Sequence, residues 1–488
     1  MSTTDRLESD LKQHEYVLTQ LETDLGKPLH VVFLDRIRET AEGFKNVVHD
    51  LYPDALVAFA VKSNPCRGAV RTAKRLQLGA DVASENELRL ALEEGIDPED
   101  IICNGNAKSA FYLEQALSAG CFIAVDNHDE LTALEKLTRA TDRTAEILLR
   151  FRGMPLSGFT SADQSTAADW TKFGFHIDEA PARFEQLRDH PLLRLRGISA
   201  HIGTQIAEPH GYERLFGHLI GLCEHARSIG VPLDTVDLGG GYPVAFLTLE
   251  EWSRFRNRLL ARLSGQPDQA SSVTWNDIPM GYAHRCRDAS SQQWLGKSYW
   301  SAHPAAQMLR HLLSQTDATG CTRSERLHAV GSPRLIVEPG RSLIAPAGVT
   351  LTTVAGVKEV LGHHVVALDM GINNHGTNLI SPDLFPAAVW PRRADDVDVE
   401  AFLAGRLCFS GDMISKAKVW LNRLPASGDS FVLFHTGAYG ADHFASRSCG
   451  FLIPPKVAIA EDGQVEVWRR PERFEQVFGS PDDPLTFS

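Results

Sequence analysis

Reactive side chains stand at the ends of several short apolar runs of this sequence. Lys62 closes the run LVAFAVK (56–62), His201 lies in RGISAHIG (196–203), and Glu338 follows RLIV. A lysine at the end of a buried strand is unusual, because loss of water disfavours its ammonium and lowers its pKa. A lowered pKa is what a Schiff-base lysine requires. The pattern therefore predicts amine chemistry at Lys62, and a lysine that extends past its strand to water is the alternative.

Two further segments would suit an anionic ligand. Gly239-Gly240-Gly241 follows TVDL and leaves bare backbone amides at a strand-to-loop turn, which permits close approach to a phosphate. In EPGR, Glu338 and Arg341 offer a carboxylate and a guanidinium. A carboxylate facing a pyridine nitrogen keeps that nitrogen protonated, and a guanidinium binds phosphate through its rigid fork of donors. Taken one at a time, these segments are also compatible with tight turns, a surface ion pair and a core histidine.

The elements that must position these residues alternate along the chain. Eight short apolar runs, mostly separated by helical patterns, are found at 56–62, 80–84, 100–105, 121–127, 146–152, 196–203, 235–242 and 334–341. Parallel strands need helical crossovers, so the alternation predicts a parallel sheet with helices outside. Eight units favour a closed (β/α)8 TIM-like barrel, with an open doubly wound sheet as the alternative. In such a barrel reactive groups lie at the carboxyl ends of the strands, where Lys62, His201 and Glu338 fall.

We expect three parts in the chain. Residues 1–35 form an N-terminal segment that packs with a β domain, and residues 36–343 form the barrel, with an insertion at about 245–330. Residues 344–488 form a C-terminal all-β domain, because β-rich segments such as GVTLTTVAGVKEV and DSFVLFHTG follow without long helices. A long excursion between two barrel strands is a lid, an oligomer contact or a decoration.

Composition limits the function classes. The chain has 488 residues, 43 % of them apolar, and a net charge of −13 without a long basic run. We therefore expect a small-molecule partner and neither nucleic acid nor membrane as partners. The eight cysteines show no metal-ligand spacing, and the N-terminus carries acids where a signal peptide needs an apolar stretch. We expect a reduced, cytoplasmic protein without a metal site.

Seven blocks, taken together and in order, resemble the fold-type III pyridoxal-phosphate (PLP) decarboxylases. The blocks are AVKSNP (60–65), KFG (172–174), HIGTQ (201–205), DLGGGYP (237–243), EPGR (338–341), CFSGD (408–412) and GAYG (437–440). That family includes diaminopimelate, ornithine and lysine decarboxylases. The resemblance extends from about residue 30 to 460 and implies an alanine-racemase-like barrel with a C-terminal β domain. It implies a PLP-dependent amino-acid decarboxylase.

The resemblance also implies roles for individual residues. Lys62 would hold PLP as a Schiff base, His201 would stack on the cofactor ring, and Glu338 would pair with its pyridine nitrogen. Asp81 and Arg150 match positions that line the pocket near Lys62. Around the phosphate the resemblance places Thr204, Gly239, Gly240, Gly241, Arg341 and Tyr439, with Gly340 as a further cofactor-binding residue. Cys408 matches a cysteine that crosses a dimer interface and protonates the product, so a homodimer with shared active sites is expected.

The predicted substrate-reading residues depart from the diaminopimelate decarboxylase pattern. Phe409 replaces the Glu of the family's CESGD block, and Ser381 stands before Pro382 where those enzymes carry Arg. Asp412 of the same CFSGD block is the third residue assigned to the substrate. Without the Glu and the Arg, nothing obvious compensates the desolvation of a charged diaminopimelate tail. We therefore predict that diaminopimelate is not the main substrate, and that a neutral, apolar or carrier-attached amino acid fits better.

Two other functions stay open at this point. One is a PLP-dependent amino-acid racemase or epimerase, which would need a second base in the β domain where this chain has the Cys408 block. The other is a PLP-binding regulator without turnover, although Lys62, Glu338 and Cys408 are all retained. Product analysis separates these functions, because they yield CO2 and an amine, an inverted amino acid, or nothing.

Overall fold

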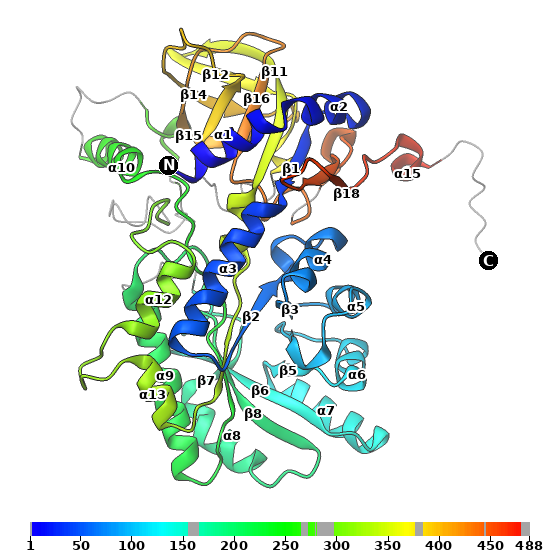
Figure 1. Ribbon diagram of the computed structural model, residues 1–488, viewed down its shortest axis with the longest axis vertical. Helices are drawn as coiled ribbons and strands as arrows, with labels where there is room; N and C mark the ends of the chain where they lie inside the picture. Colours follow the sequence, from blue (N-terminus) through cyan, green and yellow to red (C-terminus); the bar gives the residue numbers. More distant parts are fainter. Residues whose placement is uncertain are drawn as a thin grey trace. The chain divides into compact units, whose positions relative to one another are not determined.

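The computed structural model describes residues 2–154, 165–264, 272–278, 280, 297–375, 384–443 and 446–479. The chain divides into two compact units (Figure 1). The barrel unit consists of Ile37–Ala245 and Lys297–Ile344. The β unit consists of Met1–Arg36, Phe246–Gly296 and Ala345–Ser488.

Eight parallel strands close into the barrel. Their order is β5-β4-β3-β2-β10-β9-β8-β6, and pairing of β5 with β6 closes the ring. The strands are β2 (Ala55–Ala60), β3 (Gly79–Val82), β4 (Ile101–Cys103), β5 (Phe122–Val125), β6 (Ala145–Arg152), β8 (Leu193–Ser199), β9 (Thr235–Asp237) and β10 (Arg334–Val337), with the short β7 (Phe175–His176) beside β6. The eight predicted strands and the closed barrel are confirmed, and the open sheet is wrong.

Helices follow most of these strands and surround the barrel (Figure 1). They are α3 (Leu34–Leu51), α4 (Arg67–Arg75), α5 (Glu85–Glu93), α6 (Ala110–Ala119), α7 (His128–Thr141), α8 (Ala180–Leu187), α9 (Pro209–Ser228), α12 (Ala306–Ser314), α13 (Arg323–Ala329) and α14 (Arg341–Ile344). Three of these helices begin with side-chain caps just beyond a strand. The side chains of Ser84, Ser109 and Asn127 accept backbone N–H groups at the starts of α5, α6 and α7. Such caps fix where each helix begins and therefore fix the loop between strand and helix.

The interior of the barrel is apolar. Side chains from several strands form one buried cluster, which contains Leu56, Ala58, Ile102, Phe122, Ala124, Leu148 and Ile336. Residues two apart in one strand point to the same face, so Leu56 and Ala58 both point inward from β2. The barrel is therefore a packed core, and polar chemistry is left to the ends of the strands.

The β unit contains a nine-stranded sheet. Its main path is β15-β14-β12-β11-β1-β17-β18, and β16 pairs with both β11 and β13. The strands are β1 (Leu29–Phe33), β11 (Gly348–Val360), β12 (His363–Leu368), β13 (Ala387–Trp390), β14 (Val399–Ala404), β15 (Met413–Leu421), β16 (Ser430–Phe434), β17 (Lys456–Ile459) and β18 (Val465–Arg469), followed by α15 (Phe474–Phe478). The N-terminal helices α1 (Thr3–Gln13) and α2 (Glu15–Leu25) bury Leu7, Leu11 and Leu18 in the same core as strands β1, β11 and β17.

The expected insertion at 245–330 is not one excursion from the barrel. Its first part, with α10 (Leu249–Leu263), belongs to the β unit, and its last part belongs to the barrel unit. Arg258 of α10 forms an ion pair with Glu400 of β14, and the ring of Trp275 lies edge-on to Phe402, 5.2 Å between centroids. Side-chain contacts with β14, rather than any local sequence pattern, therefore place the first part of residues 245–330 in the β unit.

No helix in the described part of the chain has both the length and the apolar character needed to cross a membrane. The seven described cysteines are free thiols, and Cys286 lies outside the described residues.

Candidate active site

Lys62 lies at the carboxyl end of β2, in a single helical turn formed by Val61–Ser63. Its Nζ donates to Asp81 Oδ2, and Asp81 is the neighbour of Ala60 in the register of β2 and β3. The Asp81 side chain is fully buried, whereas that of Lys62 is 37 % exposed. The pair therefore places an amine at the rim of the barrel, held by a carboxylate beneath it.

Asn104 continues this network across the strand ends. It follows β4, and its Nδ2 donates to Asp81 Oδ1 and to Glu338 Oε1, each at 2.8 Å. Lys62, Asp81, Asn104 and Glu338 thus form one chain of polar contacts across the barrel mouth. Asn104 is not predicted as a site residue, because an asparagine after a strand is common in turns.

Glu338 directly follows β10 and is 3 % exposed. Burial raises the pKa of its carboxyl well above the usual range, and the nearby Asp237 and Asp81 raise it further. Asp237 is itself buried, and burial raises its pKa to about 6, against the lowering effect of hydrogen bonds from Ser199 and Gly239. This edge of the barrel is therefore rich in buried carboxylates, which favours a cationic ligand.

His201 follows β8 and presents a neutral ring. The backbone N–H of Gly240 donates to its Nδ1 at 2.9 Å, which leaves the ring proton on Nε2 in the neutral form. Desolvation, with Lys62 and Arg150 as nearby cations, lowers its pKa to about 3. The imidazole is therefore uncharged at neutral pH.

Gly239, Gly240 and Gly241 bring backbone close to the ends of neighbouring strands. Gly239 and Gly241 have φ values of +69° and +96°, a region that favours glycine. A Cβ on Gly240 would meet the carbonyl oxygen of Glu338 at 2.3 Å. Because the amides of Gly239 and Gly240 already donate to Asp237 and His201, these two glycines contribute close approach rather than free donors.

Two basic side chains, Arg341 of the EPGR segment and Lys297, lie near each other. Arg341 is 9 % exposed and begins α14, and Gly340 packs against Ala60 and Ser63 so closely that a Cβ would lie 2.9 Å from that of Ala60. Lys297 is 8 % exposed, and burial together with the nearby Arg341 lowers its pKa well below the usual range. Sequence reasoning missed Lys297, because it lies in a poorly periodic segment.

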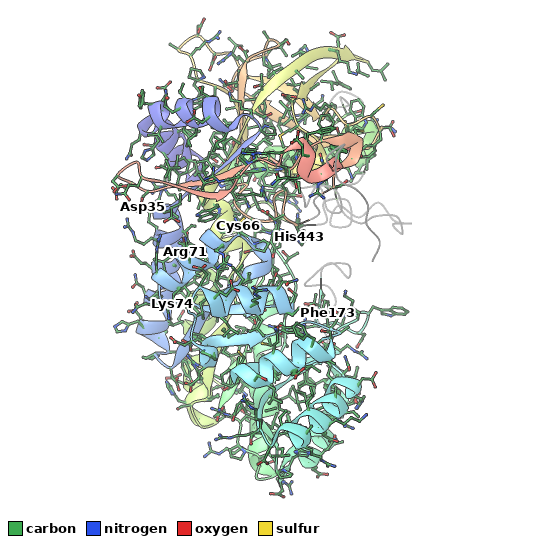
Figure 2. All side chains as sticks on the ribbon, turned by 90° about the vertical axis from the view of Figure 1, so that its right-hand side faces the viewer. Asp35, Cys66, Arg71, Lys74, Phe173 and His443 are labelled. Atoms are coloured by element: carbon green, nitrogen blue, oxygen red, sulfur yellow. The ribbon has the colours of Figure 1, made fainter. Side chains whose placement is uncertain are left out.

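Thr204 and Arg150 lie on the neighbouring strand ends. Thr204 is half-buried in the loop after β8, and the adjacent Gln205 fixes that loop by donating to the carbonyl of Val244 at 2.7 Å. Arg150 of β6 lies 3.7 Å from Asp126 through Nη1. Its guanidinium carbon is 4.2 Å from the ring centroid of Phe173, which Figure 2 labels. Neither residue has a described direct contact with Lys62.

The remaining predicted residues belong to the β unit. Cys408 and Phe409 are exposed, Phe409 by 47 %, and the backbone N–H of Cys408 donates to Cys449 Sγ at 3.4 Å. Asp412 is buried, and its two carboxylate oxygens accept the backbone N–H groups of Ile372 and Leu407. These bonds make Asp412 a support of the loop that carries Cys408 and Phe409, a role that the predicted substrate contact did not include.

Tyr439 is half-buried, with its ring edge-on to His443 at 4.7 Å between centroids. Ser381, the third predicted substrate residue, lies outside the described residues.

The donor set of the barrel mouth suits pyridoxal phosphate. A buried Glu338 among other carboxylates calls for a cationic partner, and a protonated pyridine nitrogen is one. The uncharged His201 ring can lie on an aromatic ring without opposing that charge. Arg341 and the close backbone of the glycine turn match a phosphate, and Lys62 supplies the amine.

Comparison with known proteins gives consistent results. The family "Pyridoxal-dependent decarboxylase, pyridoxal binding domain" matches residues 34–264. Diaminopimelate decarboxylase of Halalkalibacterium halodurans is 28 % identical over 93 % of this chain and 90 % of its own length, and that of Bacillus subtilis is 27 % identical over 93 % and 90 %. A crystal structure of diaminopimelate decarboxylase from M. jannaschii with L-lysine covers 95 % of this chain and 94 % of its own, with a TM-score of 0.72 and 21 % identity.

Proposed function

Since the chain belongs to the fold-type III PLP-dependent decarboxylases, we propose that it removes the α-carboxylate of an amino acid other than diaminopimelate. PLP-dependent amino-acid decarboxylation is the activity of this family, and pyridoxal phosphate is its cofactor. The single observation that supports the assignment of this site is the contact chain from Lys62 through Asp81 and Asn104 to Glu338.

Lys62 is proposed as the residue that binds the cofactor covalently. When bound, pyridoxal phosphate supplies an aldehyde for the substrate amine and a protonated ring that accepts the electrons released with CO2. The carboxylate of Asp81 accepts a hydrogen bond from the Lys62 amine and so holds the amine at the strand end. This contact keeps the amine at the strand end, the position from which it would bind the cofactor.

Glu338 is proposed to hold a proton at the pyridine nitrogen. Its pKa is raised by burial and by Asp237 and Asp81, so it shares a proton with a basic nitrogen more readily than an exposed glutamate would. The neutral His201 ring would stack on the cofactor without adding charge. Together, Glu338 and His201 would favour the protonated, electron-accepting state of the ring.

Arg341, Thr204 and the turn Gly239–Gly241 are proposed to hold the phosphate, and Tyr439 is proposed as a further cofactor-binding residue. Cys408 is proposed to return a proton to the substrate carbon after CO2 has left, a role that its exposed thiol allows. We further propose that two subunits form a dimer with shared active sites, and that the protein works in the cytoplasm. The place of Cys408 in the CFSGD block supports the shared sites, because the matching cysteine of the family reaches across a dimer interface.

The substrate is proposed to carry a neutral, apolar or carrier-attached side chain. Phe409 replaces a glutamate of the diaminopimelate enzymes, and its ring is 47 % exposed in the β unit. A phenyl ring lacks the charge of a glutamate and offsets the desolvation of a distal ammonium less well, whereas it packs readily against apolar substrate atoms. The L-lysine in the M. jannaschii enzyme is a ligand of that relative.

A screen for CO2 release on the purified, PLP-saturated protein tests the proposal. Amino acids with apolar, neutral and dibasic side chains are offered together with diaminopimelate, and products are identified by mass spectrometry. We expect CO2 and an amine from an apolar or neutral substrate. Turnover of diaminopimelate at ordinary enzyme rates would overturn the substrate proposal. An inverted amino acid, or no product, would favour the racemase or the regulator.

A second measurement tests the attachment residue. Borohydride reduction should fix PLP to the wild-type protein and leave none on Lys62→Ala. Lys74→Ala is the matched control, because Lys74 lies on the neighbouring α4 and pairs only with a surface carboxylate, Asp97, among its described contacts (Figure 2). Covalent cofactor on Lys62→Ala would show that another amine is used.

A further inference from the structure

Asn104 occupies a position between two buried acids. It is 8 % exposed, and its single side-chain nitrogen lies 2.8 Å from Asp81 Oδ1 and 2.8 Å from Glu338 Oε1. Its backbone N–H donates to Val82 at 2.7 Å, which fixes the residue against the end of β3. Asn104 therefore lies where three strand ends, those of β3, β4 and β10, meet.

The chemistry of the neighbours fixes the orientation of the amide. Both contacted atoms are carboxylate oxygens, which accept when ionised, so the NH₂ group and not the carbonyl must face them. An NH₂ group has two hydrogens, one for each acid. Asn104 therefore donates a hydrogen bond to each of the two buried acids.

We infer that Asn104 is a positioning residue that holds Asp81 and Glu338 in place by donating to both, and so couples the cofactor-binding amine to the group at the pyridine nitrogen. The inference rests on the proposed roles of Lys62 and Glu338. Lys62 contacts Asp81, and Asp81 and Glu338 share the Asn104 amide. A change of charge at Lys62 therefore alters the electrostatic environment of Glu338 through these contacts, and the reverse also holds. An apolar residue in place of Asn104 would leave Asp81 with the Lys62 amine as its donor and would remove the donor that Asn104 provides to Glu338.

Several titratable groups face this pair from the surrounding strands and helices. They are Lys62 after β2, Glu87 of α5, Arg150 of β6, His201 after β8, Asp237 of β9 and the hydroxyl of Tyr242. Among them Asp237 raises and Lys62 and Arg150 lower the pKa of Glu338. The hydrogen bond from Asn104 favours the ionised form of Glu338, so its loss should raise the pKa of Glu338 further.

The test compares purified Asn104→Ala with the wild-type protein, with pyridoxal phosphate as the probe. Apo-protein is titrated with PLP to obtain the dissociation constant, and the absorbance of the bound cofactor is then followed across pH. We expect Asn104→Ala to bind PLP about tenfold more weakly, because one hydrogen bond to a charged group is lost at each acid. We expect the acid-side midpoint of the absorbance change to move up by about one pH unit.

Asn127→Ala is the matched control. Asn127 follows β5, the next strand, and caps α7 without contacting either acid in the described structure. This variant should lose stability but keep the wild-type midpoint. Asn104→Asp, which has the same shape and replaces the donors by a third carboxylate, should move the midpoint upward further, and it serves if Asn104→Ala does not fold.

Unchanged midpoints in both Asn104 variants would overturn the inference, even if their stability or activity fell. A midpoint shift that Asn127→Ala reproduces would also overturn it, because the shift would then reflect general loosening. If the wild-type protein bound no PLP, or if Lys62→Ala kept covalent PLP, the proposed function would fail and this inference with it. If PLP is attached at Lys62 and only the shift is missing, the proposed function stands and Asn104 has no such role.

Discussion

At the scale of single residues, the barrel mouth contains acids whose burial disfavours their ionised form. Burial raises the pKa of both Glu338 and Asp237, the latter to about 6. Buried acids of this kind are stable as ions only beside a cation or a donor. A protonated cofactor nitrogen would supply the cation that the protein itself does not place against Glu338 in the described structure.

Replacement of Glu338 by Gln tests this dependence. The amide has nearly the same shape but cannot hold a proton on the pyridine nitrogen, so we expect kcat to fall by about 10²-fold, within the range for loss of one proton-holding group. KM should change little, because the substrate does not depend on Glu338 for binding. Steady-state kinetics with the substrate found in the screen provides the measurement. A kcat within a factor of two of the wild type would contradict the role of Glu338.

At the scale of elements, the strand ends are held close by glycine. A Cβ on Gly240 would meet the carbonyl of Glu338 at 2.3 Å, so Gly240→Ala must push the ends of β9 and β10 apart. We expect a loss of about 1–3 kcal/mol in the free energy of unfolding, as for an overpacked site, and weaker PLP binding.

Gly221→Ala is the control for Gly240→Ala. Gly221 lies in the middle of α9 with no atom near its Cβ position, so alanine there should stabilise the protein by about 0.5–1 kcal/mol. Urea unfolding and PLP titration measure both variants. Equal behaviour of the two variants would show that the close approach at Gly240 is not important.

His435 provides an acid-sensitive contact at the end of β16. It is 1 % exposed, its Nε2 lies 3.0 Å from Thr4 Oγ1, and desolvation lowers its pKa from 6.5 to about 3. Between these values the unfolded chain binds a proton that the folded protein does not. The contribution of His435 is therefore complete above pH 6.5 and is lost as the pH falls toward 3.

We predict that the stability advantage of the wild type over His435→Asn shrinks below pH 6.5, by up to about 1.4 kcal/mol for each pH unit. Because the comparison uses two proteins that differ at one position, the titration of other groups cancels to first order. Urea unfolding of both proteins at several pH values gives the difference directly. A difference independent of pH would mean that His435 is not held neutral.

The barrel could be predicted from sequence, because strands buried on both faces leave apolar runs between amphipathic helices. Lys62, His201 and Glu338 were found since each ends such a run and carries unusual chemistry there. Asn104 was missed, because its importance comes from two acids distant in sequence, Asp81 and Glu338. The division of residues 245–330 was missed for a similar reason, since its first half pairs with β14 and β15 through side-chain and bridge contacts.

At the scale of the whole molecule, the proposed active site draws on two subunits. If Cys408 acts on a substrate held by Lys62 of the partner subunit, then neither Lys62→Ala nor Cys408→Ala is active alone. Co-refolded mixtures of the two variants should regain roughly a quarter of the wild-type activity, because random pairing gives hybrids with one intact site. Sites built from one subunit would give no recovery. Sedimentation of the mixture checks that dimers have formed.

The strand pairing of the β unit has a consequence for the order of synthesis. Leu29 of β1 pairs with Leu351 of β11, 322 residues later in the chain (351 − 29), and Val31 pairs with Val457 of β17, 426 residues later (457 − 31). The first strand to leave the ribosome therefore waits until the whole barrel has been translated before its neighbours exist. Contacts this distant in sequence form slowly, so an exposed β1 is where a chaperone would be needed during translation.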